Sequence, residues 1–354
     1  MRTSFVIIVL SLGLIVLCGC PEKYDNENQN SVNSISTTHS FVTNGINPSV
    51  SPSNALLAFS INGEIYISDT SGIVKKKLTN TSTYEFMPRW HPSGSSIGFI
   101  RMFDTINGYG ELILKDTATG LETIIDMILL KNEFMLSPNI THPIWSFSPN
   151  GEYVSLISNS GDSTFLNSYS IQNGNKIKSI LTSSNYLHDR SCFDYSSSGN
   201  LIYFIANDSN NVNYLYYMDI SSNDKPKIIE NSFFSMFPSR LHHRNDIGVS
   251  IAGSPYVVFD TNSEIIEKHY LIGANPKWSH DGRFILSEVF SVRSGANGFK
   301  YSTLTIKDVG ANKMYRLTTD GDIDKHNYFF EWDGTSRNIY YQKNNSIWKV
   351  HITI

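Results

Sequence analysis

The chain repeats one short β-hairpin. The stretch PKWSHDGRFIL (276–286) closely matches PRWHPSGSSIGF (88–99). Each copy carries a Trp, a turn that contains Gly, and an apolar residue seven positions after the Trp, as a strand, a tight turn and a second strand require. A repeated supersecondary unit folds as an array of stacked copies, so this repeat restricts the fold more than any other feature of the sequence.

The same seven-residue spacing marks seven units in all. Their anchor residues are Val50, Trp90, Phe147, Asp194, Arg240, Trp278 and Trp332, spaced seven residues before Leu57, Ile97, Val154, Leu201, Ile247, Ile285 and Ile339. Two further candidate strands follow the hairpins, as in EIYISD (64–69) and KKKLTN (75–80). Each of the first six units therefore supplies four short strands, which is the content of one propeller blade.

The last unit supplies only three strands and ends with SIWKVHITI (346–354). The segment HSFVTN (39–44) resembles the fourth strands of other units, so we expect it to pair beside that last strand. The predicted fold is all-β: a seven-bladed β-propeller over residues 38–354, with four-stranded blades and a ring closed by an N-terminal strand that completes the last blade. Closure of this kind removes free sheet edges.

The hairpin motif, followed by a strand that ends in Asp and then by Leu-Thr, resembles the TolB-like (WD40-like) β-propeller repeat across residues 38–354. The resemblance includes the Trp anchors and Pro48, Pro88, Pro238 and Pro276, and these prolines are expected to begin innermost strands. It implies that the conspicuous residues build the scaffold rather than a site. The small N-terminal domain of TolB and the hydrolase domain of prolyl-oligopeptidase-like enzymes have no counterpart in this sequence.

The N-terminal segment reads as an export signal. Residues 1–19 carry one positive charge and then an apolar run, as a secretory leader does. The end of this run, LCGC, resembles the bacterial lipobox, which implies a lipid on Cys20 and attachment to a membrane. Residues 20–37 are polar and are expected to form a flexible tether. We expect a lipoprotein of the bacterial cell envelope, periplasmic or surface-exposed; the alternative is an ordinary cleaved signal peptide.

The charge argues against a nucleic-acid partner, and the cysteine content argues against an intramolecular disulfide. The formal net charge is −4, and Lys and Arg form no block larger than KKK at 75–77, so no nucleic-acid partner is expected. After removal of the leader, Cys20 is expected to carry the lipid and only Cys192 remains in the propeller domain, which leaves no intramolecular disulfide. We expect a monomeric propeller.

The longest irregular segments fall on the face that carries the loops between blades. Binding residues on rigid scaffolds generally lie on such loops, so this face is the predicted site. The candidate ligand contacts are Tyr84, Arg101, Phe103, Tyr109, His142, His188, Arg190, Phe290, Arg293 and His326. The expected function is that of a non-catalytic binding scaffold for a protein, a peptide or a glycan.

Three of these residues leave an enzyme hypothesis open. His142, His188 and His326 each come shortly before an innermost strand, and neutral imidazoles can bind a transition metal. Seven-bladed oligogalacturonate lyases have similar repeats and a histidine-bound metal in this region. The resemblance therefore implies, as the alternative, a metal-dependent carbohydrate-active enzyme.

An acidic segment gives a second metal hypothesis. Asp320, Asp322 and Asp324 follow the spacing of an EF-hand loop, but Lys325 stands where that loop needs Gly. A solvated acidic loop is therefore expected. The sequence contains no phosphate-binding Gly-rich loop and no nucleophile elbow, so no catalytic residue and no cofactor is assigned.

Overall fold

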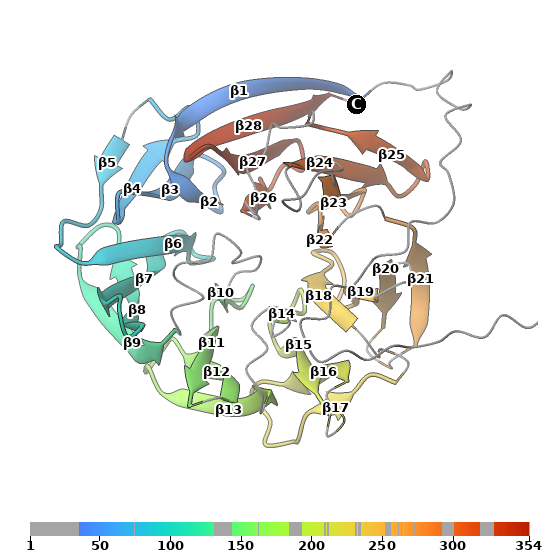
Figure 1. The fold of residues 1–354 in the computed structure, drawn as a ribbon, viewed down its shortest axis with the longest axis horizontal. Helices are drawn as coiled ribbons and strands as arrows, with labels where there is room; N and C mark the ends of the chain where they lie inside the picture. Colours follow the sequence, from blue (N-terminus) through green and yellow to red (C-terminus); the bar gives the residue numbers. More distant parts are fainter. Residues whose placement is uncertain are drawn as a thin grey trace, which may run out of the picture. The chain divides into compact units, whose positions relative to one another are not determined.

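The computed structural model describes residues 35–353, apart from 74, 131–143, 162, 184–192, 209, 211, 231, 233–234, 252–255, 261, 263, 272–273, 292–300 and 319–328. The described strands form seven four-stranded antiparallel sheets. Figure 1 shows these sheets as the blades of a ring, with the innermost strands around its axis. The predicted seven-bladed propeller is confirmed. Within the described residues, no helix has the length and apolar character that a membrane span needs.

Blades 1 to 6 run outward in chain order from their innermost strands, and blade 7 does so for its first three strands, as Figure 1 shows. Blade 1 contains β2 (Ile46–Val50), β3 (Leu56–Ile61), β4 (Glu64–Asp69) and β5 (Lys75–Lys77); blade 2 contains β6 (Tyr84–Trp90), β7 (Ser96–Asp104), β8 (Tyr109–Asp116) and β9 (Glu122–Leu129). Blade 3 contains β10 (Trp145–Phe147), β11 (Tyr153–Ser160), β12 (Ser163–Ser170) and β13 (Lys176–Ser183); blade 4 contains β14 (Phe193–Tyr195), β15 (Leu201–Asn207), β16 (Asn213–Asp219) and β17 (Lys227–Ile228). Blade 5 contains β18 (Ser235–Arg240), β19 (Ile247–Ile251), β20 (Tyr256–Phe259) and β21 (Ile265–His269); blade 6 contains β22 (Ala274–Trp278), β23 (Phe284–Ser291), β24 (Tyr301–Asp308) and β25 (Lys313–Arg316). Blade 7 contains β26 (Phe330–Trp332), β27 (Asn338–Lys343), β28 (Ser346–Thr353) and, from the other end of the chain, β1 (Ser36–Asn44).

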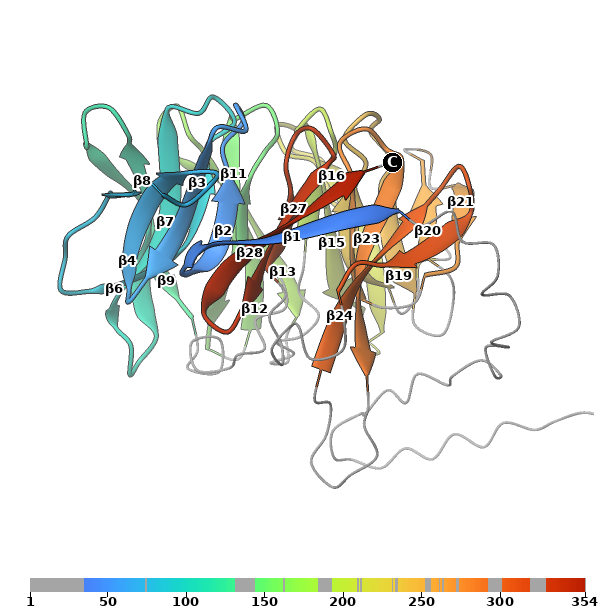
Figure 2. The same ribbon diagram turned by 90° about the horizontal axis from the view of Figure 1, so that it is seen from above.

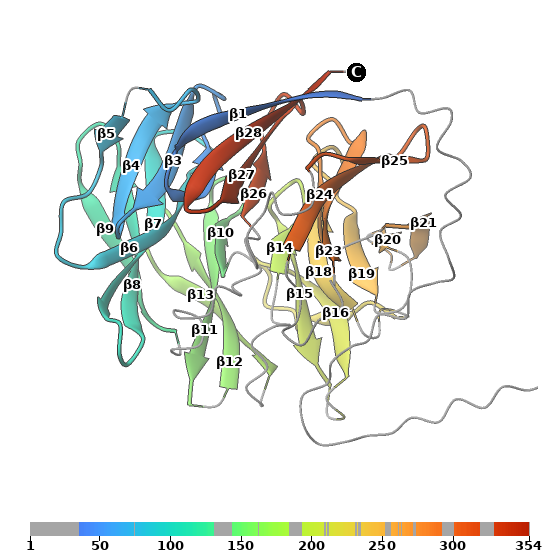
Figure 3. The ribbon, with the colours of Figure 1, turned by 45° about the horizontal axis from the view of Figure 1, so that its top comes forward.

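The ring closes through β1, as the sequence predicted. This strand pairs antiparallel with β28, from Ser36 opposite Thr353 to Asn44 opposite Ser346. Figures 2 and 3 show β1 lying along β28 on the outside of blade 7. Val42 of β1 is buried against Ile347 and the strands of blade 1, so the closing strand also joins the hydrophobic core between the first and last blades.

The predicted anchor pairing holds in six blades and is wrong in blade 4. Trp278 lies opposite Ile285 as expected, and the degenerate pair of Arg240 and Ile247 is also formed. In blade 4, however, Tyr195 pairs with Ile202, one residue beyond the predicted anchor Asp194. Side chains alternate along a strand, so the predicted register would have buried a carboxylate in the place of an aromatic ring. Tyr195 is fully buried instead.

The expectation that prolines begin the innermost strands is wrong. β6 begins at Tyr84, and Pro88 lies inside it, where the register with β7 shifts between Phe86 and Arg89. Met87, directly before the proline, has φ 52°. Corresponding shifts occur at Pro48, Pro238 and Pro276. At a bulge the hydrogen-bond ladder is interrupted, so the missing N–H of proline costs little there.

Neighbouring blades pack through large apolar side chains. Trp145 of blade 3 is fully buried, and its indole lies against Gly98 of blade 2, where a Cβ would come within 2.5 Å of it. Since the interior is close-packed, any side chain at Gly98 would push these blades apart.

The turns between first and second strands also touch from blade to blade. The ring of His91 donates a hydrogen bond to the carbonyl oxygen of Gly151, at 2.9 Å. Comparable contacts join Asn150 to Gly199, Asn245 to Ser198, His243 to Gly282, Asp281 to Ser336 and Gly334 to Asn54. These contacts join each blade to the next, from blade 2 to blade 7 and from blade 7 to blade 1. The hairpin turns on one face of the ring therefore hold neighbouring blades together.

Candidate functional site at the ring axis

In five of the seven blades the innermost strand places a partly exposed side chain just before the anchor, whereas Ser49 and Ser239 at this position are buried. The three-residue strands β10, β14 and β26 bury their first and third side chains and leave the middle one partly exposed. This pattern follows from the alternation of side chains along a strand. With Tyr195 as the anchor of blade 4, the pre-anchor residues are Ser49, Arg89, Ser146, Asp194, Ser239, Lys277 and Glu331.

Four of these residues, together with Arg240, form a charged group that we call the axial cluster. Its members are Arg89, Asp194, Arg240, Lys277 and Glu331. They come from blades 2, 4, 5, 6 and 7, yet Arg89 and Lys277 each interact electrostatically with the other four. All five residues belong to innermost strands, and Figure 1 shows these strands around the axis of the ring, where blades that are not neighbours come together.

The two carboxylates of the cluster bind backbone groups of the next blade. Asp194 accepts a hydrogen bond from the backbone N–H of Arg240, and its carboxylate also lies 3.9 Å from the Arg240 guanidinium. Glu331 accepts one from the backbone N–H of Val50. Burial raises the pKa of Glu331, while Arg89 and Lys277 oppose that rise. Part of this cluster therefore joins blades together.

Lys277 is held against blade 7. Its ammonium donates a hydrogen bond of 2.7 Å to the carbonyl oxygen of Phe330 and lies 4.8 Å from the centre of that ring. Burial, reinforced by the positive charge of Arg89, lowers the pKa of Lys277 to about 8. Near neutral pH this side chain is therefore mostly a cation, but one that gives up its proton more readily than an exposed lysine.

The guanidinium of Arg89 has unused binding capacity among the described residues. Burial lowers the pKa of its guanidinium, and the negative charge of Glu331 opposes that shift. Among the described residues, no carboxylate or carbonyl oxygen lies within hydrogen-bonding distance of this guanidinium. Arginine presents five N–H donors in a planar fork that matches a carboxylate or a phosphate. The axis therefore offers donors to an anionic group.

Four of the ten candidate contacts named from the sequence lie wholly within the described residues. Tyr84, Phe103 and Tyr109 are exposed, at 42%, 49% and 46%. Tyr84 begins β6, and the other two lie near the hairpin between β7 and β8. Arg101 lies in β7 with little exposure of its side chain. None of these four belongs to the axial cluster.

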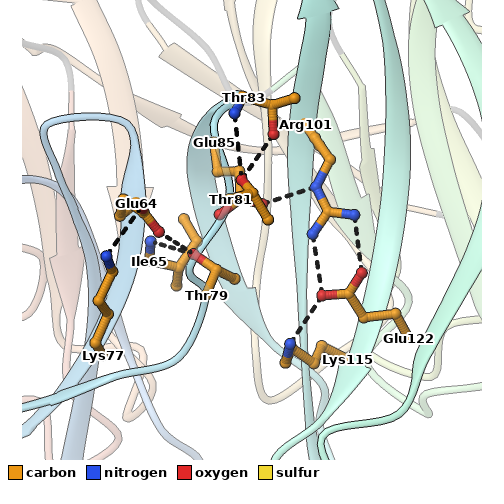
Figure 4. A network of polar contacts seen from close by, with 10 residues as sticks. All are labelled: Glu64, Ile65, Lys77, Thr79, Thr81, Thr83, Glu85, Arg101, Lys115 and Glu122. Atoms are coloured by element: carbon orange, nitrogen blue, oxygen red, sulfur yellow. Dashed lines mark hydrogen bonds and ion pairs between the residues drawn. The ribbon is translucent and has the colours of Figure 1, made fainter.

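Arg101 is engaged inside blade 2. Figure 4 shows its guanidinium between Glu85 and Glu122: Nε donates to Glu85 at 2.7 Å, and the two terminal nitrogens donate to Glu122 at 2.8 and 3.0 Å. Lys115 also donates to Glu122, at 2.8 Å. Hydrogen bonds from Arg101 lower the pKa of Glu122 more than its burial raises it. Because Glu85 is fully buried, this network compensates a charge in the core.

The remaining sequence-predicted residues lie outside the described part. The backbone of Phe290 is in β23, but its side chain is not described. His142, His188, Arg190, Arg293 and His326, the acidic residues Asp320, Asp322 and Asp324, and the lipidation candidate Cys20 all lie outside the described residues. Within the described part, no three His, Cys, Asp or Glu side chains are grouped so that they could hold a metal ion.

The sequence analysis missed the axial cluster, although a signal for it was present. Arg89 and Lys277 occupy the variable position of the motif Pro-x-Trp, and Glu331 directly precedes Trp332. A charged residue immediately before a buried aromatic anchor must face the opposite side of the strand.

No family model and no curated protein matches the chain. Among solved structures, an oligogalacturonate lyase in complex with manganese is similar with a TM-score of 0.59 and 10% identity, over 90% of this chain and 91% of the other. A chain of the mitotic checkpoint complex is similar with a TM-score of 0.59 and 13% identity, over 99% of each chain. TolB from Acinetobacter baumannii is similar with a TM-score of 0.44 and 15% identity, over 87% of this chain and 63% of the TolB chain. The chain thus spans less than two thirds of that TolB structure, and identities this low show the propeller fold alone.

Proposed function

We propose that the protein is a lipid-anchored, non-catalytic binding scaffold of the bacterial cell envelope, and that it holds a charged segment of a protein or peptide partner at the axis of the ring. The observation that carries the proposal is the axial cluster, in which the guanidinium of Arg89 has no hydrogen-bonding partner among the described residues. Complementary charges select a partner and orient it. Among the partners expected from the sequence, a peptide with carboxylate groups best fits these donors.

The axial cluster supports this proposal because it contains both positive and negative side chains. Arg89, Arg240 and Lys277 are cations, whereas Asp194 and Glu331 are anions that already accept backbone hydrogen bonds. A carboxylate that reaches Arg89 would pair with a cation without displacing any hydrogen bond between the described residues. Enclosure by the innermost strands strengthens such a pair relative to one at the surface.

Binding of defined peptides to the intact chain tests the axial proposal. A library of short peptides, with and without Asp and Glu, is titrated against the wild type and Arg89→Gln. Acidic peptides are expected to bind the wild type, and the variant should bind them at least about tenfold more weakly, the loss of one charged hydrogen bond. Lys268→Gln, at an exposed position of β21, is the matched control and should bind normally. Equal binding by wild type and Arg89→Gln would refute the axial site.

The lipid anchor has its own test. Replacement of Cys20 by Ser removes the acceptor sulfur and is expected to release a soluble, unacylated product from cells grown with a labelled fatty acid. Continued incorporation of the label into the variant would contradict the proposal.

A further inference from the structure

A pocket of about 370 Å³ lies between blades 2 and 3, away from the ring axis. Tyr109 and the end of β9 line it from blade 2, and residues of β11, β12 and β13 line it from blade 3. No residue of an innermost strand contributes to this lining. Its volume falls within the range of about 300–1,000 Å³ that is typical of small-molecule sites.

Two buried amides of the pocket wall have unused hydrogen-bonding capacity. Asn159 and Asn167 are each only 6% exposed. The amide nitrogen of Asn167 donates to Ser158 at 2.6 Å, and that of Asn159 donates to Thr164 at 3.3 Å. The amide oxygen of each has no hydrogen-bond partner among the described residues. Buried polar groups are normally paired, so two unpaired amides in one pocket wall indicate a partner that belongs there.

The charges beside the pocket cancel. Lys176 pairs with Asp126 at 3.1 Å, and the Tyr169 hydroxyl donates to the same carboxylate. The ammonium of Lys176 also lies 5.3 Å from the centre of the Tyr169 ring. These partners leave the lining without a net charge, which disfavours a strongly anionic or cationic ligand.

Apolar side chains and three serines, Ser158, Ser160 and Ser179, form the rest of the wall. Tyr109 and Met127 are 46% and 56% exposed, and Phe165 lies partly exposed beside them. An aromatic ring at the mouth of a pocket can stack on the C–H face of a flat ligand. A wholly apolar ligand would leave the two amide oxygens unpaired.

We propose that this pocket is a second binding site, for a neutral saccharide ring. A sugar hydroxyl both donates and accepts, so it can pair with either polar atom of an amide, while the C–H face of the ring packs on Tyr109. The amide oxygens of Asn159 and Asn167 are covered in this structure, so pairing with a sugar hydroxyl requires these side chains to rotate toward the pocket. This site is independent of the axial proposal, because it shares no residue with the axial cluster.

Saturation-transfer NMR on the intact chain tests the site. The probes are glucose, galactose, mannose and N-acetylglucosamine, with galacturonate and glucosamine as the anionic and cationic comparisons. At least one neutral sugar is expected to bind more tightly than both charged ones. Tyr109→Ala removes the stacking surface, and Ser179→Trp fills the pocket from an exposed position; each should weaken that binding at least fivefold.

Two controls separate this site from the rest of the molecule. Tyr270→Ala removes another exposed tyrosine, 76% exposed, that does not line the pocket, and Arg89→Gln alters the axial cluster. Both should bind the sugar as the wild type does. Absence of neutral-sugar binding, preference for a charged sugar, or unchanged binding by both pocket variants would overturn the proposal.

Discussion

The carboxylate of Asp194 accepts a hydrogen bond of 3.0 Å from the backbone N–H of Arg240, which lies in the next blade. Ser49 likewise accepts one of 3.4 Å from the N–H of Trp90. Glu331 completes the series by accepting one from Val50 across the closure of the ring. In each case a pre-anchor side chain binds the anchor N–H of the following blade. These side chains satisfy backbone donors at the inner edge of a sheet, where no further strand is available.

This relationship predicts different outcomes for two replacements of Asp194. Asp194→Ala leaves the N–H of Arg240 without its acceptor and is expected to reduce the free energy of unfolding by about 1–3 kcal/mol. Asp194→Asn keeps a side-chain oxygen in place and should cost less. Urea denaturation of both variants measures the difference. If the two replacements were equally destabilising, charge and not the backbone hydrogen bond would be the important contribution.

The lowered pKa of Lys277 predicts that the stability of the protein depends on pH. Folding lowers its pKa from 10.5 to about 8, chiefly through burial. The unfolded chain therefore binds more protons than the folded one between these two values, so the contribution of Lys277 to the free energy of unfolding increases as the pH rises through this window. In Lys277→Met this increase is absent. The stability of the wild type relative to the variant should rise by about 1 kcal/mol per pH unit from about pH 8 upward.

Urea titrations of the wild type and Lys277→Met at several pH values between about 7 and 10 check this sign. The other titrating groups are common to both proteins, so they cancel in the comparison. A difference in stability that does not change with pH, or that falls as pH rises, would contradict the prediction.

The close contact between Gly282 and His243 predicts that an alanine at position 282 destabilises the protein. Its φ is +71°, and an added Cβ would come within 2.3 Å of the His243 ring. Gly120 has a similar φ of +76° but nothing within 4 Å of its added Cβ. Gly120→Ala should therefore lower the free energy of unfolding by about 1–2 kcal/mol, through backbone strain alone. Gly282→Ala should cost a further 1–3 kcal/mol, roughly the penalty of overpacking. Thermal and urea denaturation measure the stability of both variants. If both lose the same stability, the His243 ring moves aside at no cost and the prediction is wrong.

Closure of the ring predicts a large effect of a small deletion. Removal of residues 38–44 takes away most of β1 and exposes the edge of β28. The loss of this strand's hydrogen bonds and of the buried Val42 is expected to reduce stability by on the order of 5 kcal/mol and to promote association through the free edge. Removal of residues 22–33, which lie outside the compact unit that begins at Ser34, is the control and should have little effect. Chemical denaturation and light scattering report both outcomes.

Local patterns explain why so much of the fold was predictable. Each blade repeats an anchor, a turn and an apolar residue at fixed spacing, and this information lies within about ten residues. The strand at 39–44 resembled other fourth strands closely enough to predict closure, which its pairing with β28 confirms. The errors arose where the local pattern was degenerate: in blade 4, Asp194 and Tyr195 both fitted the spacing, and only burial distinguished them.

The bulges at the prolines of the innermost strands could not be predicted from the sequence either. Pro88 restricts the strand locally, but whether it begins the strand or lies at a bulge depends on how far Tyr84 and its neighbours continue to pair with β7. That pairing is decided by the partner strand, and not by the residues around the proline.

The sequence by itself determined the number of blades, their four-stranded composition and the closing strand, because these depend on short-range periodicity. The tertiary structure decided which side chains meet. Arg89 and Lys277 are far apart in the chain and lie in blades that are not neighbours, and they interact only because the closed ring brings the innermost strands around one axis. Likewise, Tyr109 and Asn167 line one pocket because two adjacent blades pack face against face. Contacts of this kind depend on distances across the ring, which no local pattern encodes.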